Sequence, residues 1–482
     1  MRILLATSEL HPYSKSGGLA DMVGALAKNL ARLGHQVGVV TPLYAGIREK
    51  FPDLKPANIA LNLPLGPNLV SANVFSLSPE PRLEIFFIDQ PEFYDRAALY
   101  GEKGVDYPDN SQRFIFFSKC AAHLARHLPL LPEIVHLHDW QTGLVSVLIL
   151  NEKLTAGWGT PPRTCFTIHN LAYQGNFPYS DYEFTNLPPE YFTYHGLEYY
   201  GYMNCMKAGI VYSDIITTVS PRYAREILTP EFGCGLDATL RQRPERLIGI
   251  LNGVDYDEWN TDQNSHLLHG FDLDDLKAKT KNKIDLQREV GLPVHPGIPL
   301  FASITRLADQ KGVDIQLGAL EEMLSANMQF VLLGSGSPEY ELAYMNLSKR
   351  FPTKVAVRLG FDQSLSHRIE AGADFFLMPS RYEPCGLNQM YSLRYGTIPI
   401  VRVTGGLDDS VVDMTEDQDL SNGIKFEEYS VRSLAKAIRK GLVLYEHPEL
   451  LQHYRENGMA ADFSWIRTAR EYEKAYGKAL AG

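Results

Sequence analysis

The feature that most constrains the fold is an alternation of short apolar runs with segments of helical periodicity, which occurs in two series along the chain. The first series of candidate strands comprises residues 2–8, 36–42, 83–89, 133–139, 164–170, 214–220 and 247–253. The second series comprises residues 298–306, 329–336, 354–360, 374–380 and 397–403. Near-continuous apolar strands separated by helices are typical of parallel sheets covered on both faces. The sequence therefore predicts an α/β fold with two doubly wound parallel sheets.

The start of the chain predicts a βαβ unit. After the first apolar run, Ala20, Val23, Ala27 and Leu30 recur at helical spacing, and Gly34 ends the predicted helix just before the second run. The strands of such a unit are parallel, and ligands of parallel sheets bind outside the carboxyl ends of the strands. The residues that follow each strand are therefore the candidate functional residues.

Chain length predicts two domains, because a single hydrophobic core stops growing near ~250–300 residues and this chain has 482. The stretch 254–297 is polar and charged, and it separates the two series of strands. We expect a first domain at 1–245, a second at 246–457, and an amphipathic terminal helix within 458–482.

Composition and charge indicate the cellular compartment and exclude some classes of binding partner. The formal net charge of −11 disfavours general binding to nucleic acid or to an anionic membrane. The five cysteines form no CxxC pair, which disfavours a disulfide framework or a zinc ribbon. The N-terminus lacks a signal-peptide pattern, and no run of eighteen apolar residues occurs. These features predict a cytoplasmic protein.

A glycine loop follows the first strand. Lys15 precedes Gly17 and Gly18 just before the first helix, where backbone N–H groups and the helix N-terminus favour an anion. The loop matches neither the Walker A pattern nor the GxGxxG fingerprint. It predicts a phosphate contact, with a solvated lysine beside a plain glycine turn as the alternative.

Polar residues end two further strands of the first series. Asp139 follows His136 and His138, and it is placed to accept hydrogen bonds from sugar hydroxyls. His169 and Asn170 end the next strand in the same way. No third and fourth metal ligands follow the two nearby histidines at a recognisable spacing, so no metal site is predicted. A core role for His169 remains open.

Two cations and a carboxylate stand at strand ends of the second series. Arg306 and Lys311 follow one strand, close to a helix start, and form a candidate diphosphate clamp. Glu383 follows another strand in a polar turn, where a carboxylate can grip two hydroxyls or stabilise a developing oxocarbenium ion. Solvated surface charge is the alternative for the two cations.

Small residues complete this predicted site. Cys385 and Gly386 continue the turn after Glu383, and we assign them to donor binding. Thr404, Gly405 and Gly406 follow the last strand as a candidate anion nest at a helix start. The pair Asp272 and Asp274 has a DxD form, but it lies in the acidic linker and not at a strand end, which favours solvated charge.

Seven motifs in order carry a resemblance to a known family: KSGGLAD, HLHDW, TIHNLAYQG, ILNGVD, TRLADQKGVD, SHRIEAGADFFLMPSRYEPCGLNQMYSLRYG and TGGLDD. They span residues 15 to about 410. The set closely resembles bacterial glycogen synthase and plant starch synthase, the retaining glycosyltransferase family 5. Seven motifs in order at matching spacing are very specific.

The resemblance implies the GT-B fold, in which two Rossmann-like domains face each other across a cleft and the last helix returns to the first domain. It implies transfer of glucose from ADP-glucose to the non-reducing end of an α-1,4-glucan, with retention and without a metal or other cofactor. The expected partners are that donor and a glycogen or maltooligosaccharide acceptor. The sequence leaves open UDP-glucose as donor and the oligomeric state.

The resemblance also assigns roles by position. It implies that Lys15 and the Gly18 backbone meet the donor phosphates, that Arg306 and Lys311 hold the diphosphate, and that Glu383 holds the donor glucose. It places Asp139, His169 and Asn252 on the sugar and acceptor side, with His169 near the reacting carbon. It places Phe361 where the family often has a tyrosine that stacks on the base.

Two positions depart from wider patterns. Tyr391 stands where related GT-B enzymes have a second glutamate, and Gln141 follows HDW where the family often has histidine. Four alternatives stay open at this point: a GT-B glucosyltransferase with a non-glucan acceptor, a glucan phosphorylase, a non-catalytic glucan-binding protein, and a nicotinamide oxidoreductase. The missing GxGxxG argues against the last, and the intact strand-end residues argue against a non-catalytic protein.

Overall fold

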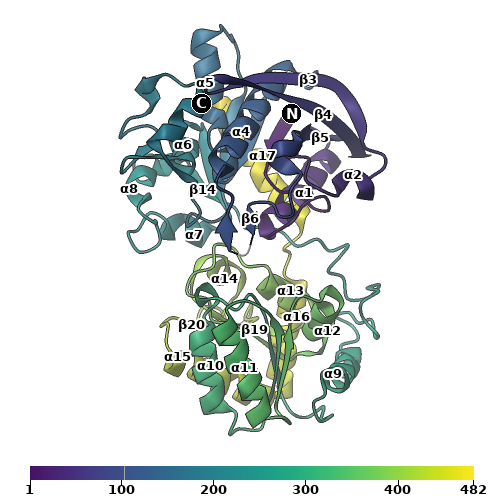
Figure 1. The fold of residues 1–482 in the computed structure, drawn as a ribbon. Helices are drawn as coiled ribbons and strands as arrows, with labels where there is room; N and C mark the ends of the chain where they lie inside the picture. The colour runs from purple at the N-terminus through teal and green to yellow at the C-terminus, as the bar shows by residue number, and fades with distance from the viewer. Residues whose placement is uncertain (103) are drawn as a thin grey trace. The chain divides into compact units, whose positions relative to one another are not determined.

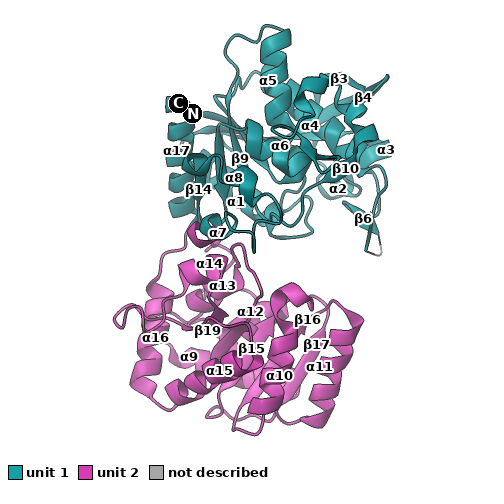
Figure 2. Ribbon diagram, turned by 90° about the vertical axis from the view of Figure 1, so that its left-hand side faces the viewer, with its two compact units in different colours: residues 1–219, 224–253, 465–482 teal, residues 220–223, 254–464 magenta. Residues whose placement is uncertain are grey.

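The structure, a computed structural model, describes residues 1–102 and 104–482 and contains two compact units (Figures 1 and 2). Unit 1 comprises Met1–Val219, Ala224–Gly253 and Trp465–Gly482, and unit 2 comprises Ser220–Tyr223 and Val254–Ser464. The boundaries expected from the sequence, after residues 245 and 457, fall a few residues earlier. Strand β14 (Leu247–Gly249) accounts for the first difference, because it pairs with β13 (Ile215–Thr218) in the sheet of unit 1.

The sheet of unit 1 has the strand order β14-β13-β9-β8-β1-β2-β5-β4-β3. Its parallel part contains every predicted strand of the first series: β1 (Arg2–Ala6), β2 (Gln36–Pro42), β5 (Leu83–Asp89), β8 (Ile134–His138), β9 (Arg163–Ile168), β13 and β14. Strand β1 lies between β2 and β8, and Ile3 is the register partner of both Val37 and Ile134. The carboxyl ends of β1, β8 and β9 therefore lie side by side.

An antiparallel hairpin extends this sheet and was not predicted. Strands β3 (Lys55–Leu65) and β4 (Asn68–Glu80) pair with each other, and β4 pairs antiparallel with β5. Most of their side chains are half-buried or exposed, so the apolar run that reveals a central strand is missing here. Short strands also form two small sheets: β6 (Gly101–Glu102) with β7 (Val105–Asp106), and β10 (Asn176–Pro178), β11 (Glu198–Tyr199) and β12 (Tyr202–Asn204).

Helix α1 (Gly18–Arg32) packs its predicted stripe into the core of unit 1. Ala20, Val23, Ala27 and Leu30 are all buried. The helix ends before Gly34, whose φ of +96° lies in the left-handed region that suits a helix C-terminus.

The last helix, α17 (Trp465–Ala481), lies beside α1 and contacts β9 and β13 (Figure 1). His35 Nε2 lies 2.7 Å from Glu473 Oε1, and Thr468 donates a hydrogen bond of 3.0 Å to the Leu251 carbonyl. The predicted return of the terminal helix to the first domain is confirmed.

The sheet of unit 2 has the order β17-β16-β15-β18-β19-β20 and is parallel throughout. Its strands are β15 (Leu300–Ile304), β16 (Gln329–Gly334), β17 (Val355–Leu359), β18 (Phe375–Met378), β19 (Ile398–Arg402) and β20 (Ile424–Phe426). The first five were predicted, whereas β20 has only three residues and gives no recognisable run. Two doubly wound parallel-sheet units are thus confirmed.

Alternate residues of these strands enter two cores, one on each face of the sheet. Phe301 and Phe330 pack in one core with side chains of α10 (Val313–Met323) and α15 (Val431–Tyr445). Leu300 and Val331 pack in the other with side chains of α9 (Lys277–Val290) and α12 (Gln363–Gly372). This alternation explains why each strand is apolar along its whole length.

The remaining helices are short connectors or cover the two sheets. They are α2 (Ile47–Lys50), α3 (Pro91–Tyr94), α4 (Asn110–His127), α5 (Val145–Thr155), α6 (Cys205–Tyr212), α7 (Pro221–Glu226), α8 (Asp237–Leu240), α11 (Pro338–Arg350), α13 (Asn388–Arg394), α14 (Gly405–Ser410) and α16 (Pro448–Ala460). Within the two described stretches, no helix combines the length and apolar character needed to cross a membrane.

Candidate active site

The glycine loop after β1 is organised by a carboxylate that sequence analysis missed. Glu9 is buried, and its carboxylate accepts hydrogen bonds from the Ser16 N–H (2.5 Å), the Ser16 hydroxyl (2.6 Å), the Gly17 N–H (3.2 Å) and the Tyr100 hydroxyl (2.7 Å). The Gly17 N–H is therefore already used within the chain. Glu9 stands in the loop without any recognisable motif around it, so its role could not be predicted from the sequence.

The outer side of this loop is open. Lys15 is exposed and forms an ion pair of 2.7 Å with Asp21 of α1. A Cβ atom added at Gly17 or Gly18 would meet no other atom within 4 Å. Packing within the chain therefore does not require glycine at either position, and a ligand can approach the backbone closely.

Asp139 lies at the carboxyl end of β8 and fixes the end of the neighbouring strand. Its carboxylate accepts a hydrogen bond of 2.8 Å from the His169 N–H. Burial raises the pKa of Asp139 to about 7, and the charge of Glu9 also raises it. The residue has a φ of +58°, a conformation that costs free energy outside glycine and often occurs at functional sites.

His169 is a half-buried imidazole supported by a second histidine. Its Nε2 lies 3.1 Å from Nδ1 of His138, which is fully buried. Burial lowers the pKa of His169 to about 3 and lowers the pKa of His138 well below its usual value. Both rings are therefore neutral at pH 7, and His138 is a positioning residue that the sequence did not indicate.

His136 has a structural role. Its Nδ1 hydrogen-bonds the Tyr476 hydroxyl of α17 at 2.8 Å, and its Nε2 lies 2.5 Å from the Thr167 hydroxyl. Across residues 1–102 and 104–482, no group of three or more histidine, cysteine, aspartate or glutamate side chains is arranged to hold a metal ion. The DxD pair forms a turn in which Asp272 accepts the Asp274 N–H at 2.9 Å.

Asn252 lies in unit 1, shortly after β14. Its side chain is 7% exposed, and its Oδ1 atom is buried without a hydrogen-bond partner among the described residues. A buried, unpaired amide oxygen is costly. Asn252 is therefore suited to a ligand that supplies the missing donor.

In unit 2, Lys311 of the predicted clamp pairs with the carboxylate of Glu383. Lys311 Nζ lies 2.6 Å from Glu383 Oε2, and the Ser380 hydroxyl donates to the same oxygen at 3.0 Å. Glu383 is 6% exposed. Neither bond uses Oε1, which leaves that oxygen available to accept from a ligand. Ser380 is a further site residue that the sequence did not single out.

The loop after β15 is joined to the loop after β18 by close backbone contact. Gly312 follows Lys311 with a φ of +68°, and a Cβ atom there would lie 2.0 Å from the Pro379 carbonyl oxygen. Only glycine fits this approach, which places Lys311 beside Glu383. Arg306 is exposed, and its guanidinium makes no ion pair with the described part of the chain.

The glycine pair after β19 is required by packing, and the anion nest predicted there stays a prediction. A Cβ at Gly405 would lie 1.9 Å from the Glu383 carbonyl oxygen, and a Cβ at Gly406 would lie 2.1 Å from the Cys385 carbonyl oxygen. The Gly406 N–H donates to the Glu383 carbonyl at 3.2 Å. The two glycines thus support the Glu383 turn from behind, and the Gly406 N–H is not available to an anion.

The other predicted donor residues of unit 2 differ in exposure. Thr404 and Cys385 are buried, and Gly386 adopts a φ of +68° in the turn. Phe361 is 84% exposed after β17, so its ring is free to stack on a planar ligand. Tyr391, which replaces a second glutamate, stacks on Trp259 with the ring centroids 3.7 Å apart.

Two family models together match most of the chain. The starch synthase catalytic domain matches residues 2–242, and the glycosyl transferases group 1 model matches residues 292–460. The chain is 46% identical to the glycogen synthase of Anaeromyxobacter sp. (strain Fw109-5) over 477 residues, which cover 99% of each chain. It is 46% identical to the glycogen synthase of Myxococcus xanthus (strain DK1622) over 484 residues, again with 99% of each covered.

Comparison with solved structures also shows similarity to a starch synthase. The catalytic domain of starch synthase IV from Arabidopsis thaliana, bound to ADP and acarbose, matches with a TM-score of 0.89 and 34% identity, and the match covers 100% of this chain and 99% of that one. A sucrose-phosphate synthase from Thermosynechococcus elongatus matches with a TM-score of 0.61 and 16% identity over 99% of both chains, which shows a shared fold.

Proposed function

The chain belongs to the glycogen and starch synthase family, and from this we propose that it transfers glucose from ADP-glucose to the non-reducing end of an α-1,4-glucan, with retention and with release of ADP. The acceptor would be glycogen or a maltooligosaccharide. Full-length identity of 46% to glycogen synthases favours this over a GT-B glucosyltransferase with a different acceptor.

The observation that carries the proposal is the Lys311–Glu383 pair at the carboxyl edge of the second sheet. The pair puts a cation for a phosphate and a carboxylate for a sugar 2.6 Å apart. Lys311 and Ser380 hold Oε2, so Glu383 presents Oε1 in a fixed direction. A preorganised charge of this kind stabilises a transition state without reorganisation at the moment of reaction.

The reaction breaks the bond between the anomeric carbon and the leaving phosphate oxygen. Positive charge then develops on the sugar ring and negative charge on the diphosphate. We assign Arg306 and Lys311 to the diphosphate, together with Lys15 and the Gly18 backbone, and we assign to Gly17 the open space through which the ligand approaches. Glu383 is assigned to the hydroxyls of the transferred glucose. We propose that the leaving phosphate helps to deprotonate the attacking acceptor hydroxyl on the same face, which gives retention.

His169, Asp139 and Asn252 are assigned to the sugar and acceptor side. The pKa of His169, lowered to about 3 by burial, keeps the ring neutral at pH 7. A neutral ring adds no positive charge next to a developing oxocarbenium ion, whereas an imidazolium would oppose it. The unpaired oxygen of Asn252 is suited to a sugar hydroxyl.

We assign Phe361 to stacking on the adenine base of the donor, because its ring is 84% exposed. Cys385, Gly386, Thr404, Gly405 and Gly406 are assigned to shaping the donor site around the Glu383 turn. We also propose a cytoplasmic location, since all five cysteines are free thiols.

A coupled assay of nucleoside diphosphate release tests the proposal. With ADP-glucose, release is expected only when glycogen or a maltooligosaccharide is present, and UDP-glucose is expected to be the poorer donor. Lys311→Ala serves as the inactive control. Equal release with and without a glucan would show that the acceptor has been assigned wrongly.

A further inference from the structure

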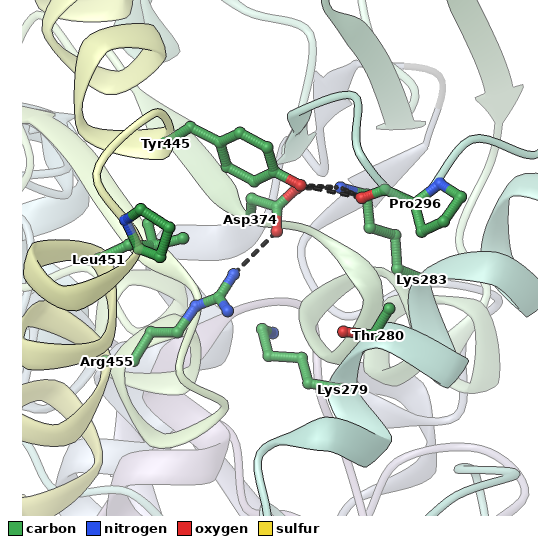
Figure 3. Close-up of a pocket in the computed structure, with 9 residues that line it drawn as sticks. Lys279, Thr280, Lys283, Pro296, Asp374, Tyr445, Leu451 and Arg455 are labelled. Carbon is green, nitrogen blue, oxygen red and sulfur yellow. Dashed lines mark hydrogen bonds and ion pairs between the residues drawn. The ribbon is translucent and has the colours of Figure 1, made fainter.

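A second polar pocket lies at the opposite edge of the unit 2 sheet from Arg306 and Glu383 (Figure 3). Asp374 directly precedes β18, and its Oδ2 accepts the N–H of Leu300 at the start of β15 at 2.9 Å. Asp374 therefore marks the amino ends of these strands, whereas the site described above follows their carboxyl ends. The pocket has a volume of about 250 Å³. Its polar lining comes from Lys279, Thr280, Lys283, Asp374, Tyr445 and Arg455.

Two cations share one carboxylate in this pocket, and Lys279 lies beside them. Lys283 Nζ lies 2.6 Å from Asp374 Oδ2, and Arg455 Nη2 lies 2.8 Å from Asp374 Oδ1. Lys279 has no carboxylate partner and donates to the Glu370 carbonyl, the Ala371 carbonyl and the Thr397 hydroxyl. The four charged side chains are 14% exposed or less. The pocket is thus positive, and its charges are poorly hydrated.

Burial and a neighbouring cation both disfavour a charge on Lys279. The pKa of Lys279 is lowered well below its usual value, first by burial and then by the charge of Arg455. Glu370 is the nearest further carboxyl, but burial raises its pKa to about 8, so it is largely protonated at neutral pH. Lys283 and Arg455 therefore carry one positive charge more than Asp374 offsets.

One hydrogen-bond donor of the pocket-lining residues is buried without a partner in the part of the chain that the structure describes. The Nε atom of Arg455 is buried without a partner among the described residues. Figure 3 shows its guanidinium and the Thr280 hydroxyl directed toward the same open volume, beside the end of Lys279. Thr280, Pro296 and Pro448 are exposed at the rim, so the pocket opens to solvent.

We propose that this pocket binds a small anion that carries a phosphate group, held by the guanidinium of Arg455, the hydroxyl of Thr280 and the charge of Lys283. A planar guanidinium pairs well with phosphate oxygens. The volume is smaller than that of pockets for drug-sized ligands, which are about 300–1,000 Å³, so the ligand is inorganic phosphate or a small organophosphate. The inference does not rest on the proposed transferase activity.

Calorimetric titration of the intact protein with inorganic phosphate tests the site. Thr280→Glu puts a negative charge at the rim on an exposed position of α9, and it should weaken phosphate binding at least tenfold. Lys281→Gln changes the net charge by the same amount on the same helix but does not line the pocket. It should bind phosphate like the wild type. Both variants should keep the turnover of the wild type.

Two further measurements establish where the phosphate binds and whether the natural ligand is phosphate or an organophosphate. Arg306→Ala removes a cation at the other edge of the sheet and should leave binding at the pocket intact. Glycerol 3-phosphate should bind more tightly than phosphate if the natural ligand is an organophosphate, and no more tightly if it is phosphate itself. The proposal is overturned if the wild type binds neither compound at millimolar concentration, if Thr280→Glu and Lys281→Gln behave alike, or if Arg306→Ala abolishes binding.

Discussion

At the residue scale, the glycines of the candidate site occupy their positions for two different physical reasons. Gly406 is required by packing, because a Cβ atom there would overlap the Cys385 carbonyl. Gly17 is not, because a Cβ atom there would enter open space and the backbone is extended. The two kinds look alike in a sequence. Only the carbonyl contacts reveal the difference.

Gly17→Ala should therefore separate folding from donor binding. We expect an unchanged thermal midpoint and a KM for ADP-glucose that rises about tenfold, which corresponds to about 1.4 kcal/mol of lost contact. Gly159→Ala is the matched control, because a Cβ atom there also meets nothing within 4 Å. An unchanged KM in Gly17→Ala would mean that no ligand approaches this backbone.

Glu383→Ala should lower kcat by about 10²–10³-fold, the cost of removing one preorganised charge from a transition state. Ser380→Ala removes one of the two bonds to Oε2 and keeps the Lys311 pair, so its loss should be smaller, about tenfold. Circular dichroism checks that both variants remain folded. A Glu383→Ala enzyme within tenfold of wild-type kcat would contradict the role assigned to this carboxylate.

At the element scale, the ends of β8 and β9 bring together two buried histidines, His136 and His138, and the half-buried His169. Burial lowers the pKa of His136 and of His169 to about 3 and lowers that of His138 well below its usual value. Below pH 6.5 these histidines bind protons in the unfolded chain but stay neutral in the native protein. The free energy of unfolding therefore falls as the pH falls. Asp139 acts in the opposite sense between about pH 4 and 7, because its native pKa is raised to about 7.

At pH 5.5 these four groups should together take up about two protons on unfolding, each worth about 1.4 kcal/mol per pH unit. His169→Gln should lower this proton uptake by about one proton. Urea unfolding at pH 5.5 and 7.5 measures the difference in stability. The account predicts a smaller acid destabilisation in the variant than in the wild type, and equal destabilisation would contradict the burial-lowered pKa of His169.

Tyr476→Phe tests how α17 is tied to unit 1. The change removes the hydroxyl 2.8 Å from His136 Nδ1 and leaves that buried nitrogen unsatisfied, at a cost of about 1–3 kcal/mol. Lys474→Ala, on the exposed side of the same helix, should change the free energy of unfolding by less than about 0.5 kcal/mol. An unchanged free energy of unfolding in Tyr476→Phe would show that the hydroxyl does not anchor the helix.

The central strands could be predicted because burial on both faces makes each of them apolar throughout, as in β15 and β18. The β3–β4 hairpin could not, since its half-exposed side chains resemble those of a loop. Among the site residues, Lys311 and Glu383 were found because they follow strands directly. Glu9 and His138 were missed, because their roles depend on partners that only the folded chain supplies, such as the Ser16 and Gly17 N–H groups.

At the scale of the whole molecule, the charge of the leaving diphosphate is assigned to Arg306 and Lys311 and not to a metal ion. Treatment with a chelator should therefore leave turnover unchanged. An Arg306→Ala variant, in contrast, should lose most of its activity whether or not magnesium is added. Activity that vanishes with the chelator and returns with magnesium would show that a cation outside the chain carries this part of the reaction.

The structure of the product shows most directly whether this protein elongates an α-1,4-glucan. The protein is incubated with ADP-glucose and maltoheptaose, and the products are separated and examined by proton NMR. The account predicts a ladder of longer oligosaccharides whose new linkages are all α-1,4, and no ladder with Glu383→Ala. Free glucose as the only product, or a new linkage of β configuration, would contradict it.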